Sequence, residues 1–218
     1  MDKKRIIEKL ISNSGATPSE NLSGIFMAGL PGAGKTELSR ALVEIANLRP
    51  VRIDMDELAT FIEGYTPEKA DVFRKEATIL LAETYSQVLK RKLDFIMDGT
   101  FSSKNAKLNI KRALKRSYNI KIVYTCQDPK LAWNFTKARE KVEHRAIKLE
   151  GFVKSYYGTI ENIKELSEKY KSQITVDVVF KTSTNEIGSW LEGIKPTEID
   201  DMIKVEYNKD NLIKYISG

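Results

Sequence analysis

The chain has 218 residues, of which 41% are hydrophobic and 30% are charged, and its formal net charge is +6. These values describe a soluble globular protein and exclude a disordered one, and the length suits one α/β domain with at most a small appendage. One cysteine and one histidine exclude a disulfide framework, a cysteine-rich zinc site and a multi-histidine metal site. No hydrophobic run has membrane-spanning length, and charged Glu8 and Lys9 interrupt the stretch that a signal peptide needs. We therefore expect a cytoplasmic protein with no membrane partner.

Predicted helices and strands alternate along most of the chain. Residues 1–22 predict a helix, Lys3–Ser12, followed by a polar linker. Hydrophobic spacing then predicts strands at 25–28, 51–54, 93–97, 120–125 and 175–180, and helices at 35–46, 67–91, 102–117, 129–142 and 150–171. This order indicates a mainly parallel sheet with helices on both faces, in a domain that spans residues 23–189. Residues 190–218 form a C-terminal appendage that the pattern does not place.

The stretch GLPGAGKTE follows the first predicted strand and opens the next helix. Its glycines allow backbone N–H groups to converge on phosphate oxygens, and the helix N-terminus adds a partial positive charge. Lys35 is expected to reach the β- and γ-phosphates, and the Thr36 hydroxyl is expected to hold Mg²⁺. The sequence therefore predicts a nucleotide-binding P-loop made of Gly29, Leu30, Pro31, Gly32, Ala33, Gly34, Lys35, Thr36 and Glu37.

Acidic residues follow two further predicted strands, at the edge of the sheet where the P-loop also lies. Asp54 ends the strand in RIDMDEL, and Asp56 comes two residues later. Asp56 can accept a proton from an attacking hydroxyl group or hold Mg²⁺, and it also suits the N-cap of the next helix. In DFIMDGTF the strand leads to Asp98, Gly99 and Thr100, and Asp98 resembles the acid that steadies the magnesium shell of P-loop enzymes. The absence of an Asp-Glu pair there favours a small phosphotransferase over an ATP-driven motor.

Two arginines lie in the segment FTKAREKVEHRAI. Arg139 and Arg145 are six residues apart, which places them about 120° apart around an unbroken helix. They can converge on one phosphate only if the helix ends or bends between them, as in a lid that stabilises the transferred group. The alternative is a surface helix held by ion pairs between residues four apart.

A basic stripe follows the acidic segment, and it allows a nucleic-acid surface or simply a solvated helix face. No aromatic residues alternate with it, so base stacking has no support and we do not expect nucleic acid as a partner. Its members are Lys104, Lys107, Lys111, Arg112, Lys115, Arg116 and Lys121.

The series GLPGAGKT, IDMDEL, IMDGTF and ARE…HRAI, over about residues 24–180, resembles the zeta toxin family of P-loop kinases. The resemblance implies an α/β P-loop NTPase/kinase fold with an arginine-bearing lid, and ATP and Mg²⁺ as cofactors. It also implies phosphorylation of the 3′-hydroxyl of the amino sugar in UDP-N-acetylglucosamine, and an antitoxin protein that blocks the nucleotide site. Asp98 stands where well-described members carry glutamate, and residues 58–73 also differ from the expected pattern.

We therefore expect an ATP-dependent kinase whose acceptor is a small molecule, and the resemblance indicates a nucleotide-sugar. The predicted catalytic residues are Asp56, Lys35, Arg139 and Arg145, the substrate residues are Asp54, Asp56, Asp98, Gly99 and Thr100, and the Mg²⁺ ligands are Thr36 and Asp98. Three alternatives stay open: a kinase of another metabolite or antibiotic, an NTPase stimulated by nucleic acid, and a nucleotide-bound interaction module without turnover.

Overall fold

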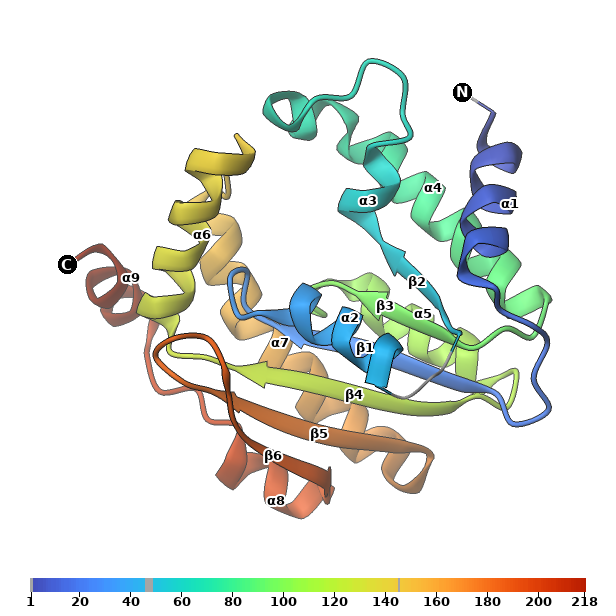
Figure 1. Cartoon of the computed structure of the whole chain (residues 1–218). Coiled ribbons are helices and arrows are strands. Elements are labelled where there is room, and N and C mark those ends of the chain that lie inside the picture. Colours follow the sequence, from blue (N-terminus) through green and yellow to red (C-terminus); the bar gives the residue numbers. More distant parts are fainter. Residues whose placement is uncertain (1, 46–48, 145) are drawn as a thin grey trace.

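A mixed sheet forms the centre of the protein in the computed structural model, which describes residues 2–45, 49–144 and 146–218 (Figure 1). Within these residues, six strands lie in the order β2-β3-β1-β4-β5-β6. Their bounds are β1 Ser23–Gly29, β2 Val51–Asp54, β3 Phe95–Asp98, β4 Asn119–Cys126, β5 Ile174–Lys181 and β6 Ile187–Ile194. The first five strands pair in parallel, and β6 runs antiparallel to β5. The expected mainly parallel α/β fold is confirmed.

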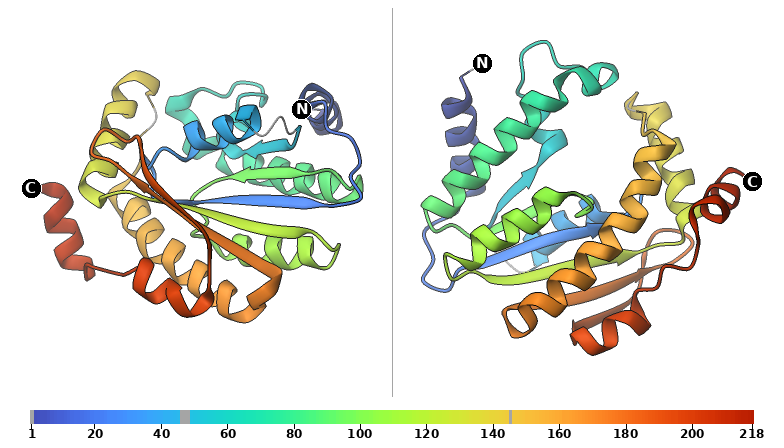
Figure 2. Two further views of the ribbon diagram at one scale, coloured as in Figure 1. Left: turned by 60° about the horizontal axis from the view of Figure 1, so that its bottom comes forward. Right: turned by 180° about the vertical axis from the view of Figure 1, so that it is seen from behind.

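Helices cover both faces of this sheet. In the described residues they are α1 Lys3–Ser14, α2 Lys35–Ile45, α3 Met55–Ala59, α4 Ala70–Lys90, α5 Lys104–Leu114, α6 Pro129–Glu143, α7 Leu149–Tyr170, α8 Pro196–Met202 and α9 Lys209–Ser217. Single 3₁₀ turns, η1 Pro67–Lys69 and η2 Lys171–Gln173, precede α4 and β5. Seen from behind, α4, α5 and α7 lie in front of the strands (Figure 2). None of the described helices is both long enough and hydrophobic enough to cross a membrane.

The central strand β1 is buried from both sides. Phe26 and Met27 are each 1% exposed, and they face opposite sides because successive side chains alternate along a strand. The Phe26 ring lies 6.4 Å from that of Tyr85 in α4 and 5.4 Å from that of Phe95 in β3. Met27 packs instead with Leu38 of α2. This burial fixes β1 in the middle of the sheet, and the loop at its carboxyl end is held with it.

After β5, the chain adds one more strand to the sheet and then forms two helices. Strand β6 forms the sheet edge beside β5, and the boundary that we expected after residue 189 falls within it. Most β6 residues are exposed, so no hydrophobic pattern marked this strand in the sequence. Helices α8 and α9 then pack against α7 and α6, where Ile199, Leu212 and Ile216 are buried.

Several element ends differ from the sequence prediction by a few residues. The helix expected at 67–91 divides into the 3₁₀ turn η1 and α4, and the strand expected from Leu93 begins at Phe95. The helix expected to end at Ala46 is described to Ile45, and Ala46 lies outside the described residues. The short helix α3 follows directly on Asp54, so it starts at the sheet edge.

Candidate active site

The loop between β1 and α2 has the backbone conformation that a phosphate cradle requires. Gly32 and Gly34 have φ angles of +77° and +75°, which residues with a side chain rarely adopt. A Cβ atom on Gly32 would also lie 2.2 Å from the carbonyl oxygen of Ala132 in α6. Glycine therefore allows both the turn and its close packing against α6.

Lys35 lies beneath this loop and is only 8% exposed. Its Nζ donates a hydrogen bond of 2.5 Å to the carbonyl oxygen of Leu30 in the loop. Burial lowers the pKa of Lys35 to about 8, the nearby Asp98 opposes this shift, and the Arg139 charge adds to it. A phosphate oxygen in the loop would offer this ammonium group a charged acceptor in place of a carbonyl.

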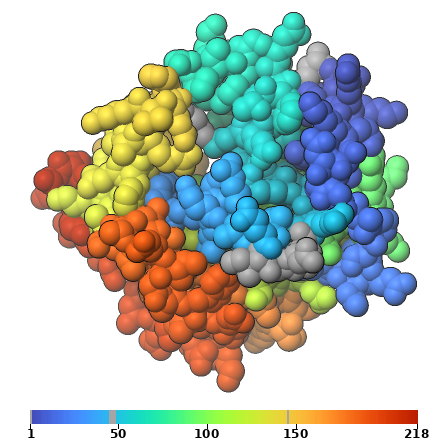
Figure 3. Space-filling model, in the orientation of Figure 1, coloured from blue at the N-terminus to red at the C-terminus, as the bar shows by residue number. Residues whose placement is uncertain are grey.

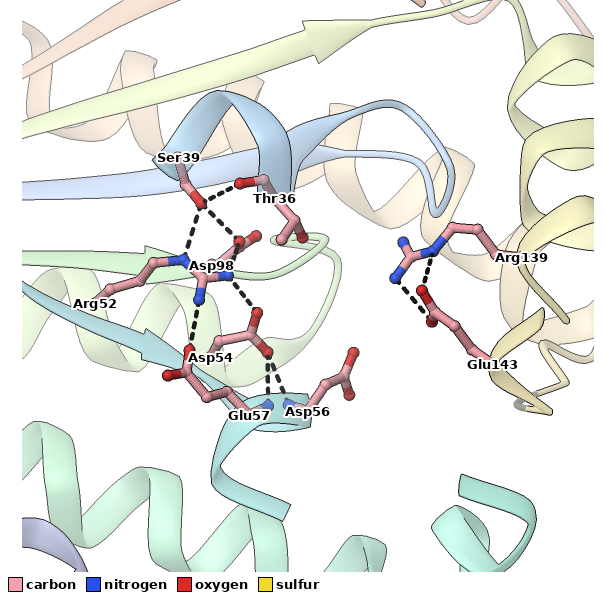
Figure 4. Close-up of polar contacts among 9 residues, drawn as sticks. All are labelled: Thr36, Ser39, Arg52, Asp54, Asp56, Glu57, Asp98, Arg139 and Glu143. Carbon is pink, nitrogen blue, oxygen red and sulfur yellow. Dashed lines mark hydrogen bonds and ion pairs between the residues drawn. The ribbon is translucent and has the colours of Figure 1, made fainter. Parts of the chain in front are cut away.

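Strands β2 and β3 end side by side, and each ends in an aspartate. Asp54 and Asp98 are register partners in the sheet, and their side chains are 13% and 4% exposed. Burial raises the pKa of Asp54, and the charges of Asp98 and Asp56 raise it further. Arg52 reaches between the two strand ends (Figure 4): its Nη2 lies 2.5 Å from Asp54 Oδ2 and 2.7 Å from Asp98 Oδ2.

The same guanidinium group binds two helices. Nη1 donates to Glu57 of α3 at 2.6 Å, and Nε donates to the Ser39 hydroxyl of α2 at 3.0 Å. The Ser39 hydroxyl can donate to Asp98 Oδ2 at 2.9 Å or to the Thr36 carbonyl at 3.0 Å. Burial alone would lower the pKa of Arg52, but its hydrogen bond to Asp98 raises it overall. No sequence pattern singled out Arg52, although strand alternation places it on the same face of β2 as Asp54.

Asp54 caps α3, and Asp56 does not. Asp54 Oδ1 accepts hydrogen bonds from the backbone N–H groups of Asp56 and Glu57 at 2.8 and 3.4 Å. The capping role considered for Asp56 is therefore wrong, because α3 begins at Met55 and its N-cap is Asp54. The half-buried Asp56 side chain points away from the Arg52 contacts, toward the space between α3 and α6 (Figure 4).

Arg139 points into this space from the opposite side (Figure 4). Its Nε and Nη2 donate to the two carboxylate oxygens of Glu143 at 3.1 and 3.0 Å, and both side chains are about half exposed. Helix α6 ends at Glu143, and His144 takes a left-handed conformation with φ of 56°. The helix thus ends between Arg139 and Arg145, as convergence on one phosphate requires, and Arg145 itself lies outside the described residues.

A cleft of ≈ 360 Å³ lies between the P-loop and the C-terminal half of α6. The surface is hollowed between α6 and the α3–α4 segment (Figure 3). Phe135, Ala138 and Val142 give the cleft an apolar wall on one face of α6, so one side suits a flat ring and the other suits phosphate. The lining residues are Gly32, Gly34, Glu37, Phe135, Ala138, Arg139, Val142, Glu143 and Asn185.

The turn between β5 and β6 also reaches the P-loop. A Cβ atom on Gly34 would lie 3.1 Å from Lys181 Nζ and 3.1 Å from Asn185 Nδ2. Gln127 Nε2 donates to Asn185 Oδ1 at 3.2 Å, which leaves the Asn185 amide nitrogen to donate elsewhere. Burial lowers the pKa of Lys181, and the charges of Glu37 and Glu186 oppose the shift. Sequence reasoning missed both residues, although the rule that functional residues follow strand ends also covers Lys181.

Gly99 and Thr100 lie between β3 and α5, beside the loop. A Cβ atom on Gly99 would meet open space, and Gly99 is exposed. The Thr100 carbonyl accepts hydrogen bonds from the Gly29 backbone N–H at 3.3 Å and from the Thr159 hydroxyl at 2.6 Å. These bonds fix the segment next to the start of the P-loop.

Only part of the expected ligand set suits a magnesium ion. Among the described residues, no group of three or more histidine, cysteine, aspartate or glutamate side chains could hold a metal. Thr36 lies in the first turn of α2, whereas Asp98 Oδ2 already accepts from Arg52 and Ser39. The donors therefore fit Mg²⁺ through the Thr36 hydroxyl together with nucleotide phosphates and water, its usual partners.

Comparisons with known proteins agree with the fold. A sequence profile described as zeta toxin matches residues 11–191. A search of curated proteins gave no match. A chain from the PezAT chromosomal toxin–antitoxin system of Streptococcus pneumoniae is 14% identical, with 100% of this chain and 94% of that chain covered and a TM-score of 0.71. AvrRxo1-ORF1:AvrRxo1-ORF2 with ATP is 11% identical, with 95% and 76% covered and a TM-score of 0.63. At these identities the similarity to solved structures shows a shared fold.

Proposed function

The chain belongs to the zeta toxin family and is a P-loop kinase, and from this premise we propose that it transfers the γ-phosphate of ATP to a hydroxyl group of a nucleotide-sugar. Three side chains carry the proposal: Lys35 is bonded to the P-loop, Arg139 lines the cleft beside that loop, and Asp56 points toward the space between α3 and α6. Arg139 adds to the burial that lowers the pKa of Lys35. Burial alone would lower the pKa of Arg139, but its hydrogen bond to Glu143 raises it overall, with a smaller contribution from the charge of Asp56.

The nucleotide phosphates would lie on the backbone N–H groups of the P-loop, at the N-terminus of α2. Lys35 would exchange the Leu30 carbonyl for a phosphate oxygen, and Arg139 would exchange Glu143 for the γ-phosphate. Arg145, placed by the sequence on the chain just beyond α6, would act beside Arg139. Mg²⁺, when bound at Thr36, would neutralise charge that develops on the phosphates.

Asp56 would act as the general base. One carboxylate oxygen accepts the proton of the acceptor hydroxyl, whose oxygen forms a bond to the γ-phosphorus. The bond between that phosphorus and the β–γ bridging oxygen breaks, and ADP leaves with the electron pair. Lys35, Arg139 and Arg145 stabilise the charge on the transferred group.

The acceptor would lie along the ends of β2 and β3. Gly99 is exposed and borders open space, and the Thr100 carbonyl is bonded to the start of the P-loop, which supports a role of this segment in acceptor binding. Asp54 and Asp98, which we also expected to touch the acceptor, both accept hydrogen bonds from Arg52. We propose UDP-N-acetylglucosamine as the acceptor on the strength of the family resemblance.

An acceptor screen with radiolabelled ATP tests the substrate class. We expect label to transfer to UDP-N-acetylglucosamine. Label on another metabolite or an antibiotic, with this nucleotide-sugar unlabelled, would keep the kinase and reject the acceptor. Hydrolysis stimulated by DNA or RNA would favour the nucleic-acid alternative. The structure speaks against that alternative, because two lysines of the basic stripe already bind acids within the protein: Lys107 pairs with Glu165, and Lys121 pairs with Asp177.

Replacement of the proposed base tests the mechanism. We expect Asp56→Asn to lower kcat by about 10²- to 10⁴-fold, because the amide cannot accept the proton. Calorimetric affinity for ADP should stay within about twofold, since the P-loop is untouched. Glu63→Gln, an exposed acid beyond α3, is the control and should keep full activity. An Asp56→Asn enzyme with wild-type kcat would remove Asp56 from the reaction.

A protein partner is the last part of the proposal. The similar PezAT chain comes from a toxin–antitoxin system, and the family resemblance implies an antitoxin that blocks the nucleotide site. We propose that such a partner of this chain covers the cleft between the P-loop and α6. A bound partner should then abolish ADP binding in calorimetry, and an unchanged ADP affinity in the complex would reject this placement.

A further inference from the structure

One nitrogen of Arg52 occupies the centre of the acidic cluster at the strand ends. Nη2 lies within 2.7 Å of two carboxylate oxygens, Asp54 Oδ2 and Asp98 Oδ2, which belong to register partners on neighbouring strands. Two aspartate oxygens facing a common point form the beginning of a divalent-cation site, because Mg²⁺ and Mn²⁺ prefer carboxylate ligands. In this protein the common point holds a guanidinium nitrogen.

The cluster needs a cation for electrostatic reasons. The Asp98 side chain is 4% exposed, and the Arg52 and Asp54 side chains are each 13% exposed, so water screens their charges poorly. Two neighbouring buried carboxylates without a counter-charge would repel each other and resist ionisation. Arg52 supplies the counter-charge permanently, since arginine keeps its proton in proteins.

Arg52 also determines where Asp56 lies. Its Nη1 holds Glu57, the residue next to Asp56 in α3, and its Nε holds Ser39 in α2. Asp54, which caps α3, is held by Nη2 of the same group. A single side chain therefore fixes the start of α3 relative to β3 and to the helix that follows the P-loop.

We propose that Arg52 is the built-in cation of this cluster: its guanidinium takes the position between Asp54 and Asp98 that a divalent metal would otherwise take, and it positions α3 so that Asp56 points toward the space between α3 and α6. Asp98 is then the counterion of Arg52 and not a metal ligand, and the nucleotide-free protein binds no divalent ion at this cluster. Only the effect on catalysis rests on the proposed kinase function.

Mn²⁺ binding in the absence of nucleotide, monitored by electron paramagnetic resonance, tests whether Arg52 takes the position of a metal ion. We expect no binding by the wild-type protein and about one Mn²⁺ per chain in folded Arg52→Met, because two carboxylates then face each other unneutralised. Adding Asp98→Asn to Arg52→Met should remove that site. Arg112→Met is the matched control, since Arg112 is half-buried, binds Ser86 and stacks on Tyr85 away from the cluster. Binding by the wild type, or none by folded Arg52→Met, overturns the proposal.

Asp98→Asn alone decides the question if Arg52→Met does not fold. As a counterion, Asp98 is dispensable for metal binding, so Mg²⁺ should increase the ADP affinity of Asp98→Asn by the same factor as in the wild type. If Asp98 is a metal ligand, calorimetry should show this Mg²⁺ effect reduced by about tenfold or more. That reduction would overturn the proposal, whatever the acceptor of the enzyme is.

Steady-state kinetics test the positioning role. Arg52→Met should lower kcat by about 10- to 100-fold and leave the KM for ATP nearly unchanged, because it displaces the base and not the P-loop. Arg52→Lys should recover part of kcat, since one ammonium group can bridge two carboxylates but cannot also hold Ser39 and Glu57. A rise in KM with unchanged kcat would contradict this role. If no acceptor is phosphorylated by the wild type, the Mn²⁺ and ADP measurements still stand.

Discussion

Lys35, Arg52 and Lys181 bring three positive charges to the carboxyl ends of β1, β2 and β5, and each has different partners. Arg52 is neutralised by carboxylates, whereas Lys35 Nζ binds a backbone carbonyl and Lys181 Nζ lies against Gly34. Lys35 and Lys181 therefore supply positive potential that a triphosphate can use. Two predictions concern these two lysines.

The first prediction is a pH dependence of ADP binding that depends on Lys35. Because burial lowers its pKa to about 8, Lys35 is charged below that pH and loses its charge as the pH rises through it. Calorimetric ADP affinity should therefore fall above about pH 8, by up to tenfold per pH unit. Lys35→Arg keeps its charge and should bind ADP with a flat profile over the same range. A flat wild-type profile would contradict the lowered pKa.

The second prediction is that Lys181 binds the part of the nucleotide that passes Gly34. Lys181→Met should weaken ADP binding by about tenfold at low salt. At high salt the difference in ADP affinity between this variant and the wild type should mostly disappear, because the contact is a charge–phosphate interaction. The kcat at saturating ATP should change little. Lys204→Met, an exposed lysine beyond β6, serves as the control and should bind ADP like the wild type. Equal ADP affinities of Lys181→Met and wild type would exclude the contact.

At the scale of elements, α6 carries Arg139 and is anchored at its first turn. Asp128 is the N-cap of α6 and accepts from the Leu131 backbone N–H at 2.9 Å through Oδ1. Its other oxygen accepts a hydrogen bond of 2.7 Å from the Tyr215 hydroxyl of α9. The bond to α9 therefore anchors α6 at the end of the helix opposite Arg139.

Removal of this anchor should destabilise the protein modestly. Tyr215→Phe deletes one hydrogen bond to a carboxylate, which costs about 1 kcal/mol and lowers Tm by about 2–4 °C for a chain of this size. Differential scanning calorimetry measures the change. Tyr170→Phe at the end of α7 is the control and should keep the wild-type Tm. If Tyr215→Phe melts like the wild type, the α9 contact does not hold α6.

At the scale of the whole molecule, the aromatic cluster behind β1 joins the sheet to α4. The rings of Phe26, Tyr85 and Phe95 meet edge to face, with centroids 5.2 to 6.4 Å apart. All three side chains are at most 1% exposed. The strands that carry the P-loop and Asp98 therefore share one core with the helix that supports α3.

Truncation in this cluster should affect global stability. Phe95→Ala should lower the free energy of unfolding by about 3–5 kcal/mol, because it removes a buried ring and leaves a cavity. Urea denaturation should show a lower midpoint with an unchanged m-value. Leu108→Ala, at a position 58% exposed on α5, should change stability by less than about 0.5 kcal/mol. A Phe95→Ala loss as small as that of Leu108→Ala would show that the cluster is not central to stability.

The features that the sequence determined by itself are local along the chain. The P-loop needs glycines, a lysine and a threonine at fixed spacing between a strand and a helix, so nine consecutive residues specify it. Hydrophobic periodicity likewise predicted the α/β order, because each element buries one side or both sides of itself. The rule that functional residues follow the carboxyl ends of parallel strands predicted that Asp54 and Asp98 lie at one edge of the sheet. In the structure they are register partners there.

Only the tertiary structure decided which side chains at that edge meet. Arg52 bridges β2, β3, α2 and α3, and the turn that carries Lys181 and Asn185 reaches Gly34 from β5, about 150 residues away along the chain. These contacts depend on strand order and register, which no short sequence pattern encodes. Strand β6 was not predicted for a related physical reason. It is an exposed edge strand whose backbone pairs with β5, while most of its side chains face water. Backbone pairing and not side-chain burial therefore defines this strand.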